Sequence, residues 1–250
     1  MDQKPNIDLL VVSCDSFSDA WSPFFKSLRY YWKDCSLNIF LLSNEKECKE
    51  LNVNTIKVGT DISWSDNLIK AIDNLKSEYV LLLLEDLFIV NKVSSNYFEK
   101  ILKWIELKSP NYLRLTISHK SKVFDKLVGK IPHKTPYKTS LMPSIWKKSI
   151  LKEILKSGES AWDFEIKGSL RASKYDDFYA LQKNLINYEN AIIKGCWRRS
   201  IINNRFYSLN INTISRPIMT ITEDFIYFLR KKRSKLFNKL PNFYKNFIKN

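Results

Sequence analysis

The hydrophobic pattern between residues 63 and 90 changes period once. Apolar residues recur at helical spacing in residues 68–75, whereas residues 79–84 form an unbroken apolar run that is too short for a second helix. A strand that is apolar on both faces is typical of a parallel sheet covered by helices. The pattern therefore predicts a helix that leads into a buried central strand.

The same alternation of periods extends over most of the chain. It predicts buried strands at residues 7–13, 37–42, 55–58, 112–117 and 187–193, helices at residues 21–32 and 91–108, and a strand followed by a helix in residues 141–158. Strands that alternate with helices form right-handed crossovers and a parallel sheet. We therefore predict an α/β fold with a mostly parallel central sheet flanked by helices, and a basic helical C-terminal tail.

Two acids, Glu85 and Asp86, directly follow the central apolar strand, and no basic residue adjoins them. This is the edge at which open α/β sheets bind ligands. Two carboxylates beside an apolar segment repel each other and lose hydration unless a cation or a set of donors meets them. A divalent metal that carries a diphosphate would meet them. The alternative is that one acid caps the next turn while the other pairs with a surface lysine.

Residues 67–86 resemble the nucleotide-sugar half of GT-A glycosyltransferases, in which a helix, a Glu-Tyr-hydrophobic strand and an Asp-x-Asp or Asp-Asp signature follow one another at this spacing. The resemblance covers residues 7–90. It implies a divalent cofactor, Mn²⁺ or Mg²⁺, held by Asp86 and Glu85. The signature here reads Glu85-Asp86-Leu87-Phe88, so its third acidic position is missing. That departure leaves open whether the ion binds through Asp86 alone or is absent from the reaction.

The resemblance also implies a nucleoside site in the loops after the first and third strands. Asp15 follows the first strand, while Asp61, Trp64 and Asn67 follow the third. An indole ring stacks on a base, and a carboxylate accepts a hydrogen bond from a ribose hydroxyl or a base imino group. The alternatives are a packing role for Trp64 at the helix entry and a turn role for Asp15.

A second acidic segment lies between Gly158 and Gly168 and contains Trp162, Asp163 and Glu165. Inverting GT-A enzymes carry a general base in such a downstream motif, so the resemblance implies that Asp163 or Glu165 deprotonates the acceptor hydroxyl and that Trp162 stacks on the acceptor sugar. The alternative is a capping acid and a core tryptophan. Residues 143–168 also resemble small bacterial glycosyltransferases of surface-polysaccharide and lipopolysaccharide assembly.

The net charge of +15 requires a negatively charged partner or surface. In the tail, residues 222–250, Lys and Arg alternate with aromatic and aliphatic residues, which predicts an anchor on an anionic membrane surface, with a solvated tail or a nucleic-acid arm as alternatives. Arg198 and Arg199 either clamp the donor diphosphate or face solvent. No stretch reaches about 20 apolar residues, and residues 1–6 lack a signal-peptide pattern. We therefore expect a cytoplasmic protein, peripheral on the inner membrane face.

Other classes fit the sequence less well. The chain has 5 glycines and no glycine-rich loop, which argues against a P-loop, a dinucleotide site and a nucleotidyltransferase. Its 2 histidines are too few for a zinc site, and its 4 scattered cysteines are expected to be free thiols. A non-catalytic nucleic-acid-binding protein is the alternative from another class, although the best-defined loop edge carries acids that phosphate backbones avoid.

These observations together predict a glycosyltransferase. It would move a sugar from a nucleotide-sugar donor to a glycan or lipid-linked acceptor in bacterial surface-polysaccharide synthesis, with inversion. The expected layout is a catalytic domain at residues 1–221, with a donor half at 1–90 and an acceptor half at 91–221, followed by the tail at 222–250.

Overall fold

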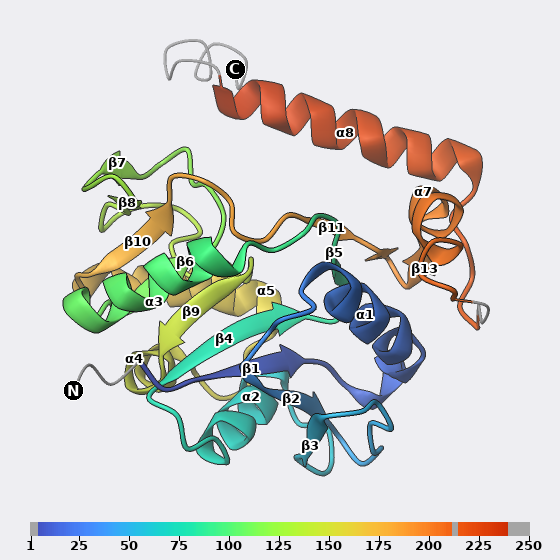
Figure 1. Cartoon of the computed structure of the whole chain (residues 1–250), viewed down its shortest axis with the longest axis horizontal. Helices are drawn as coiled ribbons and strands as arrows, with labels where there is room; N and C mark the ends of the chain where they lie inside the picture. The colour runs from blue at the N-terminus through green and yellow to red at the C-terminus, as the bar shows by residue number, and fades with distance from the viewer. Residues whose placement is uncertain (1–4, 212–214, 240–250) are drawn as a thin grey trace. The chain divides into compact units, whose positions relative to one another are not determined.

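The computed structural model describes residues 5–211 and 215–239 (Figure 1). The chain divides into two compact units, Met1–Glu189 and Asn190–Asn250. The first unit contains a nine-stranded sheet, and the second contains short strands and helices. A domain boundary at residue 221 stays a prediction.

The large sheet is the frame of the first unit. In spatial order its strands are β3 (Val53–Lys57), β2 (Asn38–Ser43), β1 (Ile7–Val12), β4 (Tyr79–Leu84), β9 (Ser144–Lys147), β6 (Tyr112–Arg114), β10 (Phe178–Leu181), β8 (Val128–Lys130) and β7 (Lys122–Val123). All of these run in one direction except β9 and β8. The predicted α/β class with a mostly parallel central sheet is confirmed.

Helices cover both faces of this sheet (Figure 1). On one face lie α1 (Ser18–Tyr31), which follows the 3-10 turn η1 (Asp15–Phe17), and α3 (Ser95–Lys108). The other face carries α2 (Trp64–Asp73), α4 (Lys148–Ile154) and a composite helix over residues 161–174. The composite helix consists of α5 (Ala161–Asp163), the π-helical turn η2 (Phe164–Gly168), α6 (Ser169–Arg171) and η3 (Ala172–Lys174).

Strand β1 shows why both faces are covered. All six of its residues are buried. Leu10 and Val12 belong to one core cluster with residues of α2, α4 and the composite helix. Side chains alternate between the faces of a strand, so Leu9 and Val11, which are also buried, point to the opposite face. Five of the six residues are apolar, as expected for a strand that is buried on both faces, and the sixth, Asp8, accepts a hydrogen bond from Asn38 Nδ2 at 3.2 Å.

Some element boundaries differ from the predicted ones. Helix α3 begins at Ser95 rather than at residue 91 because the Ser94 hydroxyl accepts a hydrogen bond from the Tyr97 N–H and caps the helix. Strand β6 ends at Arg114, three residues before the predicted end. Strand β5 (Leu87–Ile89), which pairs with β11 (Tyr188–Asn190), follows the acid pair directly.

The second unit contains β12 (Ile192–Ile193), β13 (Cys196–Trp197), α7 (Arg199–Ile201), the π-helical turn η4 (Ile202–Phe206) and α8 (Ile221–Lys239). Helix α8 confirms the predicted helical tail as far as Lys239, and residues 240–250 of that tail lie outside the described residues. Across residues 5–211 and 215–239, no helix is both long and apolar enough to cross a membrane. The four cysteines are free thiols.

Candidate active site

The candidate site lies at the carboxyl edge of the parallel strands. Strand β1 pairs with β2 on one side and with β4 on the other, so the order β3-β2-β1-β4 changes direction between β1 and β4. In open α/β sheets a ligand crevice forms at such a switch point, beyond the carboxyl ends of the strands. The loops after β1 and β4 carry Asp15 and the pair Glu85 and Asp86, as predicted.

The acid pair is held between two apolar strands, β4 and β5. Glu85 is only 8% exposed. The Oδ1 atom of Asp86 is buried and has no hydrogen-bond partner among the described residues. Burial raises the pKa of Asp86 from its ordinary 3.8 to about 6, because the charged carboxylate loses its hydration. A buried oxygen without a partner is uncommon in folded proteins and is one of the features that mark functional sites.

A second unpaired acceptor lies at the start of α2. Ser63 caps this helix by accepting a hydrogen bond from the Asp66 N–H. Asn67, one turn inside, is 5% exposed and donates from Nδ2 to Asp61 Oδ1 at 2.6 Å. Its Oδ1 is buried and has no hydrogen-bond partner within the part of the chain that the structure describes. Two of the predicted donor-binding residues, Asn67 and Asp86, therefore leave a buried oxygen unsatisfied at the same edge of the sheet.

Asp15 shapes the neighbouring loop. Its carboxylate accepts hydrogen bonds from the backbone N–H groups of Asn44, Glu45 and Lys46 at 3.0–3.2 Å. The Asp15 N–H in turn donates to Asn44 Oδ1 at 3.1 Å. The backbone donors occupy both oxygens of the carboxylate, so Asp15 fixes the conformation of this loop beside the crevice.

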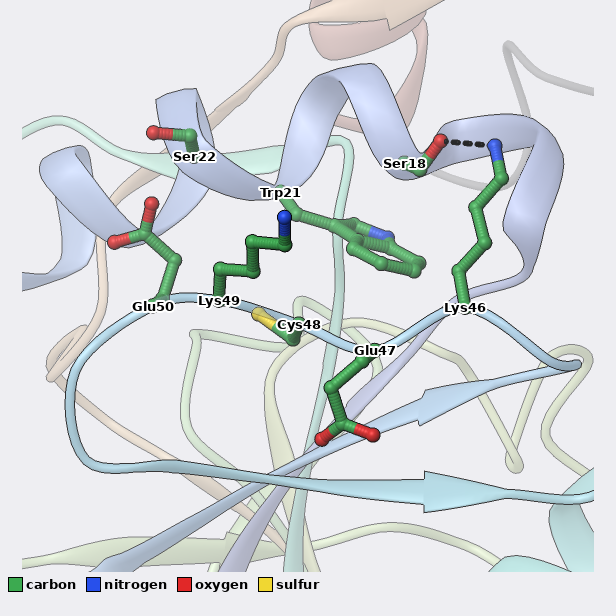
Figure 2. A pocket seen from close by; sticks show the side chains of 8 residues that line it. All are labelled: Ser18, Trp21, Ser22, Lys46, Glu47, Cys48, Lys49 and Glu50. Carbon is green, nitrogen blue, oxygen red and sulfur yellow. Dashed lines mark hydrogen bonds between the residues drawn. The ribbon is translucent and has the colours of Figure 1, made fainter.

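A pocket of about 440 Å³ opens between this loop and α1. Figure 2 shows its wall formed by the ring of Trp21, with Lys46 reaching across to the Ser18 hydroxyl at 2.8 Å. Two lysines and two glutamates line the pocket. Since their formal charges cancel, the pocket has no clear preference for an anion or a cation.

The turn that precedes the composite helix is hydrogen-bonded to the start of α2. The Ser65 N–H donates to the Glu159 carbonyl at 3.1 Å, and the Glu159 N–H donates to Ser65 Oγ at 3.0 Å. The Gly158 N–H donates to Asp66 Oδ2 at 3.0 Å. These bonds place residues 160–165 beside the start of α2, although the two segments are about 95 residues apart in the sequence.

Trp64 is the side chain that touches both segments. Its half-buried ring packs against Phe164, with 5.4 Å between the ring centroids and 44° between the planes. Phe164 is fully buried and also contacts Trp146 in the core. The ring of Trp64 thus packs on the composite helix, which is the packing role considered from the sequence, and its role in nucleoside binding stays a prediction.

Asp163 has the capping role that the sequence offered as the alternative. Its carboxylate accepts hydrogen bonds from the Ser160 N–H and hydroxyl in a capping box. It also pairs with Lys167 at 2.7 Å. Lys167 and Ser160 together lower the pKa of Asp163 to about 2. A carboxylate of such low basicity takes up a proton poorly.

Glu165 is held through one of its two carboxylate oxygens. It lies on the π-helical turn η2, and such turns are frequent at functional sites. Its Oε1 accepts a hydrogen bond from the Leu141 N–H at 2.8 Å, which fixes the carboxylate. No residue in the described part of the chain hydrogen-bonds its Oε2. Glu165 is half-buried.

Two cationic residues on this side of the sheet, Arg114 and Lys138, were missed by sequence reasoning. Arg114 ends β6 at the carboxyl edge, and both its charge and that of Glu165 act on the buried hydroxyl of Tyr112. Lys138 is 2% exposed and donates to the carbonyls of Ala172 and Tyr175 at 3.0 and 2.8 Å, so it caps the composite helix. Arg114 could have been noticed as a single arginine at the end of an apolar strand. Nothing in the local sequence indicates that Lys138 is buried.

Arg198 and Arg199 lie in the second unit. The buried guanidinium of Arg198 donates to Asp224 Oδ1 at 2.9 Å and lies 4.7 Å from the ring centroid of Tyr227. Arg199 donates from Nε to the Met219 carbonyl at 3.0 Å. Both arginines line a pocket of about 530 Å³ within that unit. Their predicted role as a diphosphate clamp stays a prediction.

The acid pair offers some, but not all, of the ligands that a divalent cation requires. In residues 5–211 and 215–239, no group of three or more His, Cys, Asp or Glu side chains surrounds a common point. Nucleotide sites hold Mg²⁺ through one or two carboxylates and complete its shell with phosphate oxygens and water. Glu85 and the unpaired oxygen of Asp86 therefore fit such an ion together with a bound diphosphate.

We compared the chain with protein families, curated proteins and solved structures, and only solved structures are similar to it. No family model matches the sequence, and no curated protein matches it. Among solved structures, S. aureus TarS 1–349 in complex with UDP is similar with a TM-score of 0.44 and 13% identity, over 71% of this chain and 60% of that chain. The complex of TarS 1–349 with UDP-GlcNAc has a TM-score of 0.44 and 13% identity, over 83% and 64%.

The UTP-bound UGPase from Acinetobacter baumannii is similar with a TM-score of 0.49 and 8% identity, over 74% of this chain and 88% of that chain. The chain spans 36% of the longer S. aureus TarS chain, with which it shares 11% identity at a TM-score of 0.42. At these identities the likeness concerns the fold alone.

Proposed function

We propose that this chain is a glycosyltransferase that moves a sugar from a nucleotide-sugar donor to a hydroxyl of a glycan or lipid-linked acceptor. One observation carries the proposal. Asp86 Oδ1 and Asn67 Oδ1 are buried acceptors without a hydrogen-bond partner in residues 5–211 and 215–239, and both lie at the carboxyl edge of the sheet near its switch point. A nucleoside diphosphate with a bound cation supplies the charge and the donors that such oxygens lack.

The donor would lie across the loops after β1, β3 and β4. Glu85 and Asp86 would hold a divalent ion bound to the diphosphate, and the ion would offset the negative charge that develops on the leaving group. Asn67 and Asp61 would contact the nucleoside, and Trp64 would offer its remaining face to the base or the sugar. We assign Asp15 the positioning of the Asn44–Lys46 backbone in this site.

The reaction would be a direct displacement at the anomeric carbon. Glu165 Oε2 would take the proton from the acceptor hydroxyl while that oxygen forms the new bond to the anomeric carbon. The bond from the anomeric carbon to the diphosphate would break on the opposite side, and the nucleoside diphosphate would leave with the electron pair. One such displacement inverts the anomeric configuration. Glu165 is preferred to Asp163 because Lys167 and Ser160 already hold the Asp163 carboxylate.

The test of the donor site is a thermal-shift screen with UDP, GDP, CDP and TDP, each with and without Mn²⁺. A ligand at one hundred times its Kd stabilises a protein by about 2.7 kcal/mol, which for a chain of this size is about 5–10 °C. We expect one nucleotide to give such a shift, increased by Mn²⁺, lost in Asp86→Asn and kept in the exposed control Asp176→Asn. If no nucleotide shifts the wild type, the proposal is wrong.

The test of the base compares two isosteric variants at saturating donor. Glu165→Gln should reduce transfer by about 10²- to 10⁴-fold while it keeps the nucleotide-induced shift. Asp163→Asn should retain most of the transfer activity, since its carboxylate serves the helix cap. The reverse result would assign the base to Asp163.

A further inference from the structure

Two aromatic side chains from distant segments meet at the surface beside Glu165. Trp162 is 64% exposed and Tyr137 is 44% exposed. Their ring centroids are 6.2 Å apart, and the ring planes are inclined by 59°. Rings inclined in this way do not stack on each other, so each leaves a face to solvent. We call this pair the aromatic platform.

The position of the platform relative to Glu165 is set by contacts between residues 137–141 and the composite helix. Residues 137–141 run along the composite helix and contact it at three successive points. Tyr137 meets Trp162, the Thr139 hydroxyl donates to the Phe164 carbonyl at 3.0 Å, and the Leu141 N–H donates to Glu165 Oε1 at 2.8 Å. Trp162 and Glu165 are also three residues apart on the helix, about 4.5 Å along its axis. A ligand on the platform would therefore lie about one helical turn from the position of Glu165.

The backbone at Tyr137 has an unfavourable conformation for a bulky residue. Its φ of 58° lies in the left-handed region, which glycine and asparagine adopt more readily. The next residue, Lys138, is turned inward to cap the composite helix, while Tyr137 is turned outward. A glycine would allow the same turn with less strain, so packing alone gives no reason for an exposed tyrosine at this position.

We propose that Tyr137 and Trp162 form a stacking site for a sugar ring of the acceptor, and that the acceptor is therefore a carbohydrate chain. A pyranose presents C–H groups on its flat faces and hydroxyls around its rim, so it needs open aromatic faces with polar groups beside them. Lys120 lies 5.9 Å from the centroid of the Tyr137 ring, and the ion pair of Asp163 with Lys167 adjoins Trp162 in sequence. This assignment rests on the proposed function, since it takes Glu165 as the base.

These polar neighbours favour a sugar over a lipid bilayer as the ligand. Insertion of Trp162 into a membrane would draw the nearby ion pair out of water, which costs free energy. A sugar leaves that pair hydrated and offers its hydroxyls as further partners.

The test is binding of the full-length protein, without donor, to a printed array of bacterial and synthetic glycans. We expect binding to at least one glycan, reduced about tenfold in affinity by Trp162→Ala and by Tyr137→Asn. The matched control Leu170→Ala removes an exposed apolar side chain, 72% exposed, from the same helix and should leave binding unchanged. Tyr137→Asn should melt no lower than the wild type, because asparagine tolerates the left-handed backbone.

Each outcome is decisive. Absence of glycan binding by the wild type, or equal binding by the platform variants, overturns the assignment. Loss of binding to anionic vesicles, rather than to glycans, in the platform variants would also overturn it, in favour of a membrane contact. The nucleotide-induced thermal shift should persist in both variants. If that shift is absent from the wild type while glycan binding depends on the platform, the proposed transferase function fails and the sugar site stands.

Discussion

Replacement of Asp86 by asparagine should stabilise the metal-free protein while it removes donor binding. Burial raises the pKa of Asp86 from 3.8 to about 6, so the ionised side chain at pH 7 is less favourable in the folded state than in the unfolded chain. A difference of about 2.2 pKa units corresponds to about 3 kcal/mol. Asparagine has nearly the same shape without the charge, but its amide retains part of the cost of an unpaired polar group.

We therefore expect Asp86→Asn to raise the free energy of unfolding at pH 7 by about 2 kcal/mol, or Tm by about 4–8 °C. The sign follows from linkage. Because the folded pKa lies above the unfolded one, the wild type loses stability as pH rises from about 4 to about 6 and stays lower above that range. The variant lacks this loss, so the difference between the two proteins should be small at pH 4 and full at pH 7.

The assay is thermal or urea unfolding at several pH values between 4 and 7.5, with EDTA present so that no metal meets the carboxylate. Asp176→Asn is the matched control, because Lys130 lowers the pKa of this exposed aspartate and its replacement should show the opposite dependence on pH. A variant that is less stable at pH 7, or a stability difference that is the same at pH 4 and pH 7, would refute the reasoning.

Two further predictions concern a residue within the composite helix and a residue packed on it, and a third concerns helix α8. Gly168→Ala should lower stability by about 1 kcal/mol and change tryptophan fluorescence, because the added Cβ would lie 3.1 Å from the Phe164 ring and the steric cost exceeds the gain in helix propensity. A Gly168→Ala variant as stable as the wild type would contradict this and would show that the Phe164 ring shifts at no cost. Burial lowers the pKa of Lys138 to about 8, so the wild type should gain stability relative to Lys138→Met as pH rises from 8 to 10.5 in urea unfolding; parallel curves would contradict this. Phe225→Ser with Phe228→Ser should weaken co-sedimentation with anionic vesicles, since both rings are exposed on basic helix α8; unchanged binding would exclude these rings from the anchor.

The strands and the acid pair could be predicted because their signal is local. The run Tyr79–Leu84 is apolar throughout and charged residues follow it, which fixes both the strand and the position of Glu85 and Asp86 at its carboxyl end. The same holds for the helix that begins at Trp64, whose cap and apolar face are read directly from the residues.

The choice between Asp163 and Glu165 could not be made from the sequence. It depends on the N–H of Leu141, which lies 24 residues away, and on the ion pair of Asp163 with Lys167. The sequence does contain the serine at 160 that caps the helix, but a capping box and a catalytic acid have the same local pattern. The platform depends in the same way on Tyr137, whose backbone conformation no local rule predicts.

The position of β9 has a consequence for synthesis of the chain. This strand pairs with β4 on one side and β6 on the other, so the apolar strand that precedes the acid pair lacks one neighbour until residue 147 has been made. About 60 residues separate β4 from β9, and at 5–20 residues per second the ribosome needs about 3–12 s to supply them. During that time the backbone of an entirely apolar strand is open to pairing with other chains. A fragment that ends near residue 90 would keep this edge permanently, so the first ninety residues should aggregate when they are expressed alone.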